Sequence, residues 1–241
     1  MADPADASTG RERAVAGGLL VVGSVLFYAA VALIVSIADP SGRSIVSLTD
    51  EARLPVIAAN TQRWELGWMF GIAGIVVTTL GLVLFEALLR AGGDRILARL
   101  AVTTFVFGAI LTVAARAREV SVTLWAAAQT ATGAPVPALL TPTGDWANAM
   151  TAIYTALAFA SIALFGASIL ITGLITRWIG WAAVAWGIGW GLLFVVAWFS
   201  TGGFDYPVLH HVIPLLIGVA LLRESALFRQ QGPASGQAEH D

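Results

Sequence analysis

Six long apolar segments constrain this chain more than any other feature of its sequence. They are residues 15–38, 65–89, 97–117 or slightly beyond, 148–173, 178–199 and 207–222. Each is close to the roughly 20 residues with which an α-helix crosses about 30 Å of hydrocarbon. Lipid cannot satisfy backbone N–H and C=O groups, so such segments enter a bilayer as helices with internal hydrogen bonds. The sequence therefore predicts an all-α, polytopic membrane protein with a six-transmembrane-helix bundle.

The composition supports this fold class and excludes several functions. Hydrophobic residues make up 58% of the chain and charged residues only 12%, whereas soluble domains average about a quarter charged residues. A formal net charge of −2 provides no basic face for nucleic acid, so the expected partner is the lipid bilayer. The chain has no cysteine, which excludes disulfides and thiolate catalysis. It also has no lysine, so no Schiff base to retinal or a pyridoxal cofactor can form.

The placement of arginines predicts how the chain is oriented. They concentrate in the short loops on the side of the N-terminus, which by the positive-inside rule places both termini in the cytoplasm. We therefore expect a disordered cytoplasmic N-terminus over residues 1–14, a membrane domain over 15–223 and a cytoplasmic tail over 224–241. The predicted location is the cell membrane, as a multi-pass protein of the bacterial inner membrane.

Small residues at helical spacing predict where the spans pack. Lipid supplies no hydrophobic drive between helices, so close approach at small residues has to hold a bundle together. Three spans carry such stripes: Gly67, Gly71, Gly74, Thr78 and Gly81 in the second, Ala152, Ala156, Ala160, Ala163 and Ala167 in the fourth, and Gly180, Gly187 and Gly191 in the fifth. They are interpreted as packing seams and carry no information about function.

The third span ends in an arginine and a glutamate that share a helical face. Arg116 and Glu119 are three residues apart, a spacing that favours an ion pair. One interpretation is a helix end at the outer interface, with the arginine reaching the headgroups. The other is a helix that continues to Trp125 and holds the pair below the surface, where charged residues are usually paired and functional.

The second span begins with a further candidate acid. Glu65 lies between Trp64 and Trp68 at the start of the glycine-striped helix. At the other end of this span, Glu86 and Arg90 have the favourable spacing for a structural ion pair.

The last span begins with the most varied set of polar groups. Asp205, Tyr206, His210 and His211 are expected near its outer end, and Pro214 is expected to kink the helix and free the carbonyl of His210. Adjacent histidines point about 100° apart on a helix and rarely bind one ion. The sequence therefore predicts no metal site, no haem and no other cofactor.

Two further features complete the candidate site. Asp145, just before the fourth span, is interpreted as a helix cap. Trp186 and Trp190 form one aromatic face near the middle of the fifth span, interpreted as core packing or as the wall of a pocket for a lipophilic or cationic ligand. Under the predicted orientation the acids and both histidines lie on the outer side, and we expect them to surround one polar pocket.

Several short motifs resemble a widespread bacterial family of six-helix membrane proteins that is known only as a domain of unknown function. The matching residues are Arg116 with Glu119, the DWAN motif at the start of the fourth span, and ITRWIGWAAVAWG around the fifth. The family often has proline before the Arg-Trp of the last motif, where this sequence has Thr176. The resemblance covers most of residues 14–223 and implies a six-helix bundle and a functional role for the Arg116–Glu119 pair, but no activity.

Two functions fit these patterns best. A third, an ion or proton pathway, ranks last, because between the outer polar groups and Glu86 the spans offer only Thr78, Thr79, Thr104, Ser161 and Ser168. The first is a non-enzymatic membrane protein that binds a small lipophilic or amphiphilic ligand in an extracytoplasmic-side polar pocket, as a carrier, sensor or partner subunit. The expected ligand-binding residues are Glu65, Trp68, Arg116, Glu119, Trp186, Trp190, Tyr206, His210 and His211. The second is an intramembrane acid–base enzyme acting on an isoprenoid-like substrate, by analogy with membrane-integrated terpene cyclases. Its candidate catalytic acids are Glu65, Glu119 and Asp205.

Overall fold

The computed structural model describes residues 4–201 and 207–230, in which all regular secondary structure is helical. The elements in chain order are α1 (Pro4–Val35), η1 (Ile45–Ser47), α2 (Asp50–Ala59), α3 (Thr61–Ala91), α4 (Leu97–Ala131), α5 (Leu140–Thr172), α6 (Arg177–Thr201), η2 (Pro207–His211) and α7 (Val212–Gln230). Six helices, all except α2, are long and apolar enough to cross a membrane. The predicted six-helix membrane fold is confirmed.

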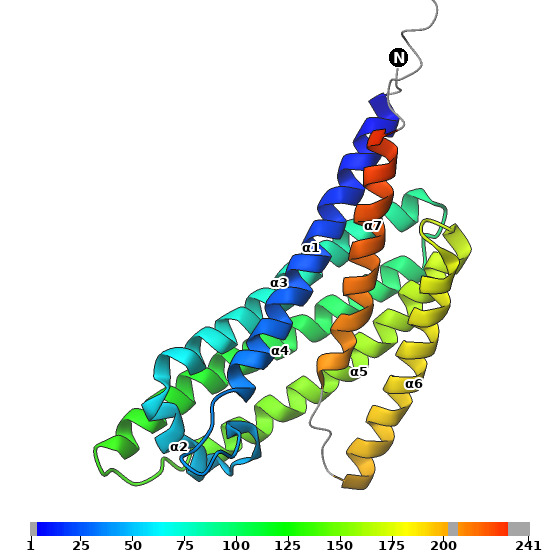
Figure 1. The fold of residues 1–241 in the computed structure, drawn as a ribbon. Helices are drawn as coiled ribbons and strands as arrows, with labels where there is room; N and C mark the ends of the chain where they lie inside the picture. The colour runs from blue at the N-terminus through cyan, green and yellow to red at the C-terminus, as the bar shows by residue number, and fades with distance from the viewer. Residues whose placement is uncertain (1–3, 202–206, 231–241) are drawn as a thin grey trace, which may run out of the picture.

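The six spans form an elongated bundle (Figure 1). α1 packs between α3 and α7, α4 packs against α3 and α5, and α6 packs along α5 while making few contacts with α7. The short helix α2 lies at one end of the bundle, against the C-terminal part of α4. We call this the α2 end, and the predicted orientation places it outside the cell.

Glycines bring the helices into direct backbone contact, as the stripes in the second and fifth spans predicted. In the predicted alanine stripe of the fourth span, Ala160 is exposed, so this stripe is not a continuous seam. A Cβ atom on Gly74 of α3 would lie 2.8 Å from the backbone oxygen of Gly23 in α1. Gly17 of α1 and Gly218 of α7 approach each other equally closely, and a Cβ on Gly187 of α6 would lie 2.6 Å from the backbone of α5. Such close approach permits the van der Waals contacts that hold membrane helices together.

Two hydrophobic clusters fill the interior. The larger one runs through the spans and includes Phe85, Phe105, Phe159 and Phe165. The smaller one lies at the α2 end, where α2 and the segment before it pack on the C-terminal turns of α4.

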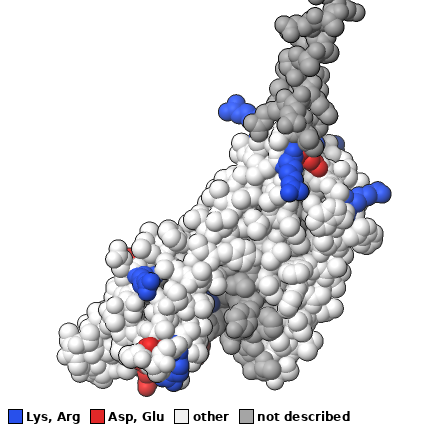
Figure 2. All heavy atoms as spheres, in the orientation of Figure 1, with Lys and Arg blue, Asp and Glu red and all other residues white. Residues whose placement is uncertain are grey.

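The charged side chains on the face shown in Figure 2 gather toward the two ends of the molecule and leave a nearly uncharged belt between them. This belt is the surface expected to face lipid.

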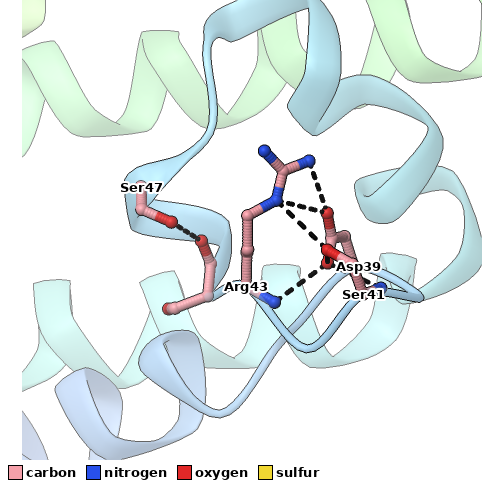
Figure 3. Close-up of polar contacts among 5 residues, drawn as sticks. Asp39, Ser41, Arg43 and Ser47 are labelled. Carbon is pink, nitrogen blue, oxygen red and sulfur yellow. Dashed lines mark hydrogen bonds and ion pairs between the residues drawn. The ribbon is translucent and has the colours of Figure 1, made fainter.

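Hydrogen bonds to Asp39 hold the polar loop before α2 in place. A turn forms at Asp39, whose carboxylate accepts hydrogen bonds from the backbone N–H groups of Ser41 and Arg43, and from their side chains (Figure 3). Because the Ser41 hydroxyl and these other donors stabilise the carboxylate, the pKa of Asp39 lies well below its usual range. The helix α2 was not predicted from the sequence; its apolar residues Leu54, Val56 and Ile57 are buried in the smaller cluster.

Several helices extend beyond the predicted spans. α4 continues through Trp125 to Ala131, as the second interpretation of the third span required. α1 begins at Pro4, within the segment predicted to be disordered, and α7 runs to Gln230. At this end Arg13 of α1 donates a hydrogen bond of 3.2 Å to Glu224 of α7, so the two helices remain paired beyond their apolar segments.

The last helix starts in the interior of the bundle. α7 begins at Val212 after the 3-10 turn η2, about halfway along the neighbouring helices (Figure 1). Pro214 is therefore in the first turn of α7, where a missing N–H costs nothing. The expectation of a kink at Pro214 inside a longer helix was wrong. The expectation that His210 and His211 lie near the outer end of the bundle was also wrong. Both lie in η2, beside Thr78 of α3 and Tyr154 of α5, which are near the middle of their helices.

Candidate functional site

The structure places the predicted site residues at three positions, two of which, the histidines and the tryptophans of α6, adjoin through the bond from Trp186 to Leu209. Arg116 and Glu119 lie near the α2 end, the two histidines lie near the middle of the bundle, and Trp186 and Trp190 lie along α6. The predicted single outer pocket, shared by all of these residues, is therefore not formed by the described part of the chain. Asp205 and Tyr206 lie outside the described residues.

The Arg116–Glu119 pair lies between the two hydrophobic clusters. The side chain of Arg116 is 15% exposed and that of Glu119 is 9% exposed, and the guanidinium bonds directly to the carboxylate. A second guanidinium nitrogen lies 3.5 Å from the amide oxygen of Asn148 in α5. The guanidinium carbon is also 5.0 Å from the ring centre of Trp68, within the range of a cation–π contact. Arg116 thus joins α3, α4 and α5.

A small cavity adjoins this pair. Its volume is about 10 Å³, and its lining includes Asp50, Arg53, Trp64, Glu119 and Thr123. A volume of this size holds about one water molecule. Trp64 closes one side, since its indole N–H donates to the Thr123 hydroxyl at 3.2 Å. The cavity is therefore too small for a lipophilic ligand. It has room for about one water molecule beside the Arg116–Glu119 ion pair.

The other two acids do not reach the Arg116–Glu119 pair. Glu65 is exposed, because it follows buried Trp64 directly and adjacent helical residues point about 100° apart. Asp145 is also exposed and lies inside α5, which begins at Leu140, so its interpretation as the helix cap was wrong. The alternative function, based on the analogy with terpene cyclases, needs a carboxylic acid that reaches an apolar cavity. Among the described candidates, Glu119 is paired with arginine and Glu65 faces outward.

The histidine pair, His210 and His211, is fully buried. His210 Nε2 lies 3.0 Å from the hydroxyl of Tyr154 in α5. His211 Nδ1 lies 3.5 Å from the hydroxyl of Thr78 in α3, and the ring of Phe27 in α1 stacks on the His211 imidazole at 3.9 Å.

The neighbours of the histidine pair fix its depth. Thr78 and Tyr154 are near the middle of the spans Thr61–Ala91 and Leu140–Thr172. Ser24, whose hydroxyl is 3.4 Å from the carbonyl oxygen of His211, is near the middle of Gly10–Val35. The imidazoles are thus at mid-span, where ionisable side chains are costly and mark functional sites.

Trp186 and Trp190 line a groove along α6. Its volume is about 370 Å³, and its lining consists of Ala182, Ala185, Trp186, Gly189, Trp190 and Leu193. The two indole rings are 5.7 Å apart. The indole N–H of Trp186 donates to the carbonyl of Leu209 at 2.9 Å, which fixes this ring against η2.

Sequence reasoning missed the partners of the histidine pair, Tyr154, Thr78 and Ser24. A tyrosine and a serine inside otherwise apolar spans were the available signal, since polar groups within lipid need partners. Their common depth could not be read from the sequence.

The described residues include no group of three or more His, Asp or Glu side chains that could hold a metal ion. No family model, curated protein or solved structure matches this chain.

Proposed function

We propose that this integral membrane protein binds one lipophilic molecule from the bilayer in the groove along α6. The observation that carries the proposal is the groove itself, with a volume of about 370 Å³. Small-molecule sites typically measure about 300–1,000 Å³ and are mostly apolar with aromatic walls. The groove has this size and this lining, whereas the cavity at the Arg116–Glu119 pair does not.

The position of the groove indicates where the ligand comes from. The residues of α6 that contact α5, such as Gly180 and Gly187, lie on the opposite side of the helix from Ala185 and Gly189, which line the groove. The groove therefore faces away from α5, and its tryptophan wall borders η2 through the bond from Trp186 to Leu209. It lies within the apolar stretch Arg177–Ser200, so in a membrane it opens to hydrocarbon.

The lining indicates the class of ligand. Ala182, Ala185 and Gly189 leave room at the floor, and the indoles of Trp186 and Trp190 form a wall. None of the six lining side chains is charged. A flat ring system or an unbranched acyl or isoprenoid chain fits such a surface, because indole faces provide large apolar contact areas.

A substitution that fills the groove tests this proposal. Gly189 has no neighbouring atom within 4 Å of a built Cβ, so Gly189→Leu adds a side chain to the groove without a clash at Cβ. Gly18→Leu on α1 is the matched control, because Gly18 is also in a span and also has open space at Cβ. Both proteins are purified in mild detergent, and the lipophiles that remain bound are identified by mass spectrometry.

We expect the wild type and Gly18→Leu to retain the same lipophile and Gly189→Leu to lose most of it. Tryptophan fluorescence quenching by brominated acyl chains provides a second measurement, since Trp186 and Trp190 line the groove. Retention of the same molecule at the same stoichiometry by all three proteins refutes the proposal.

The family resemblance and the orientation belong to the same proposal. We infer a bacterial six-helix family with both termini in the cytoplasm and the α2 end outside. Reporter fusions at the two termini and in the loop before α2 test the orientation. The Arg116–Glu119 pair is then an extracytoplasmic structural element that joins three helices, and its proposed contribution to ligand binding is indirect.

A further inference from the structure

Polar side chains from α4 and α5 face each other in successive layers between the α2 end and the histidine pair. The first layer is Arg116 with Asn148, whose polar atoms are 3.5 Å apart. One turn deeper, the hydroxyls of Thr112 and Thr151 are 3.2 Å apart. We call these two layers, together with Tyr154, the polar seam.

The seam continues to Tyr154 and then stops. Tyr154 packs directly on Gly108 of α4, since a Cβ on this glycine would lie 3.0 Å from the tyrosine ring. Gly108 is one turn from Thr112, so Tyr154 forms the third layer. The next residues along the two helices, Phe105 and Ala158, are apolar and fully buried. The seam is therefore polar on the α2 side and closed toward the opposite end.

The histidine pair lies at the closed end of the seam. The Tyr154 hydroxyl contacts His210, and the rings of His210 and His211 are 4.6 Å apart. Nε2 of His211 is buried and makes no hydrogen bond with the described residues. A buried polar atom without a partner costs free energy, and such atoms require an explanation.

We propose that the histidine pair is a proton-binding site inside the membrane bundle, reached from the α2 end through the polar seam. The chemistry of the residues supports this role. Imidazole is the side chain whose protonation changes near neutral pH. Hydroxyl groups both donate and accept hydrogen bonds, so threonine and tyrosine pass a proton along without becoming charged. Successive layers are about 5–6 Å apart, a separation that one water molecule bridges.

The proton has a defined route and destination. Asn148 is exposed, and water at this mouth supplies the proton. It passes the Thr112–Thr151 layer to the Tyr154 hydroxyl, which gives its own proton to a ring nitrogen of His210 and takes one from the seam. The product is an imidazolium at His210, whose ring centre is 4.6 Å from that of His211.

Other elements packed around the pair present few titratable groups. α5 contributes Tyr154 and α1 contributes Tyr28, whose ring centre is 6.5 Å from that of His211, whereas α3 contributes only the non-titratable hydroxyl of Thr78. α6 contributes the indole of Trp186 against Leu209. Asp205 and Tyr206 precede η2 in the chain and lie outside the described residues.

Histidine-selective NMR on the full chain in nanodiscs tests the proposal. The chain has only three histidines, so ¹⁵N labelling gives few ring signals, and His210→Asn and His211→Asn assign them. Ring signals are followed over about two pH units on either side of the ordinary histidine pKa of about 6.5. The rate at which the ring N–H protons exchange with D₂O is measured separately.

The seam variant is the double substitution Thr112→Val with Thr151→Val, which keeps the side-chain shape and removes both hydroxyls. The control is Thr79→Val, because the Thr79 hydroxyl bonds within its own helix, to the carbonyl of Ile75. Tyr154→Phe is a second seam variant that removes only the last hydroxyl. It keeps the test decisive if the double variant does not fold.

We expect the pair in the wild type to gain a proton while the protein remains folded. Both seam variants are expected to slow exchange about tenfold or more, which corresponds to about 1.4 kcal/mol of added barrier, and Thr79→Val is expected to leave it unchanged. Equal exchange rates in a seam variant and the control overturn the proposed route. Absence of any protonated ring before unfolding overturns the proton-binding role.

Discussion

Two glycines that are two residues apart on α6 predict opposite responses to one added methyl group. In Gly187→Ala the new Cβ lies 2.6 Å from both the Ala163 nitrogen and the Phe159 oxygen. Both atoms belong to the α5 backbone and cannot rotate away. In Gly189→Ala the new Cβ has no neighbour within 4 Å. The same substitution therefore tests packing at one position and acts as its own control at the other.

The expected loss follows from these distances. Ordinary contact begins at 3.4 Å, so relieving the clash at Gly187 moves α6 from α5 by about 0.8 Å, the difference between 3.4 and 2.6. A gap of about 0.5–1 Å removes a quarter to a half of each dispersion contact, and overpacking typically costs about 1–3 kcal/mol. Alanine recovers up to about 1 kcal/mol of helix propensity. We expect Gly187→Ala to lose about 1–2 kcal/mol and Gly189→Ala to lose nothing.

Unfolding in detergent with increasing denaturant measures both free energies. The native chain has no cysteine, so spin labels can be attached at introduced cysteines on α5 and α6 to measure the helix separation by pulsed EPR. Longer α5–α6 distances are expected in Gly187→Ala alone. If the two alanine variants unfold with the same free energy, α5 and α6 are not held by the close backbone contact described above.

The remaining predictions concern polar contacts. Arg116→Ala leaves the nearly buried Glu119 carboxylate without its ion partner and is expected to lower the free energy of unfolding by about 3 kcal/mol; Glu119→Gln, which keeps a hydrogen-bond acceptor, is expected to lose less in the same denaturation assay. Asp94 caps α4, and its carboxylate accepts hydrogen bonds from three backbone N–H groups. Burial opposes its ionisation, but the nearby Ser168 hydroxyl, which is not hydrogen-bonded to any described residue, and these three donors together lower its pKa. Its stabilisation is therefore present above the ordinary carboxyl pKa of about 3.9 and is lost as the pH falls through the lowered value; Asp94→Asn should cost about 1 kcal/mol at neutral pH and flatten this part of a Tm-against-pH profile, and an unchanged acid slope contradicts the cap. Trp186→Phe removes the bond to the Leu209 carbonyl and should cost about 1 kcal/mol, with altered ring signals of His210; unaltered signals show that this bond does not position η2.

Features that depend on neighbouring positions in the sequence could be predicted. The spans follow from their apolar length, and the Arg116–Glu119 and Glu86–Arg90 pairs follow from helical spacing and are present. The glycine seams follow from the same periodicity. The exposure of Glu65 was also predictable in principle, because Gly67 and Trp64 share a face that Glu65 does not.

Features that depend on how the helices are placed in depth could not be predicted. His210 and His211 were expected at the outer side because the sequence shows a polar stretch before the last apolar segment. Their true depth depends on where α7 starts relative to α1, α3 and α5. No local pattern encodes the distance that the chain travels between the end of α6 and η2. The pairing of Thr112 with Thr151 and of Tyr154 with His210 likewise depends on the relative shift of whole helices.

The late start of α7 has a consequence for how the protein is made. The span Leu209–Ala226 has the lowest mean hydropathy of the six, 1.3 against 2.6 for Gly10–Val35. We therefore expect the translocon to integrate this segment poorly by itself and well once α1 is present, since Gly17 and Gly218 meet and Arg13 pairs with Glu224. Synthesis of the first helix would thus prepare the place of the last, and glycosylation mapping of α7 with and without α1 measures this dependence.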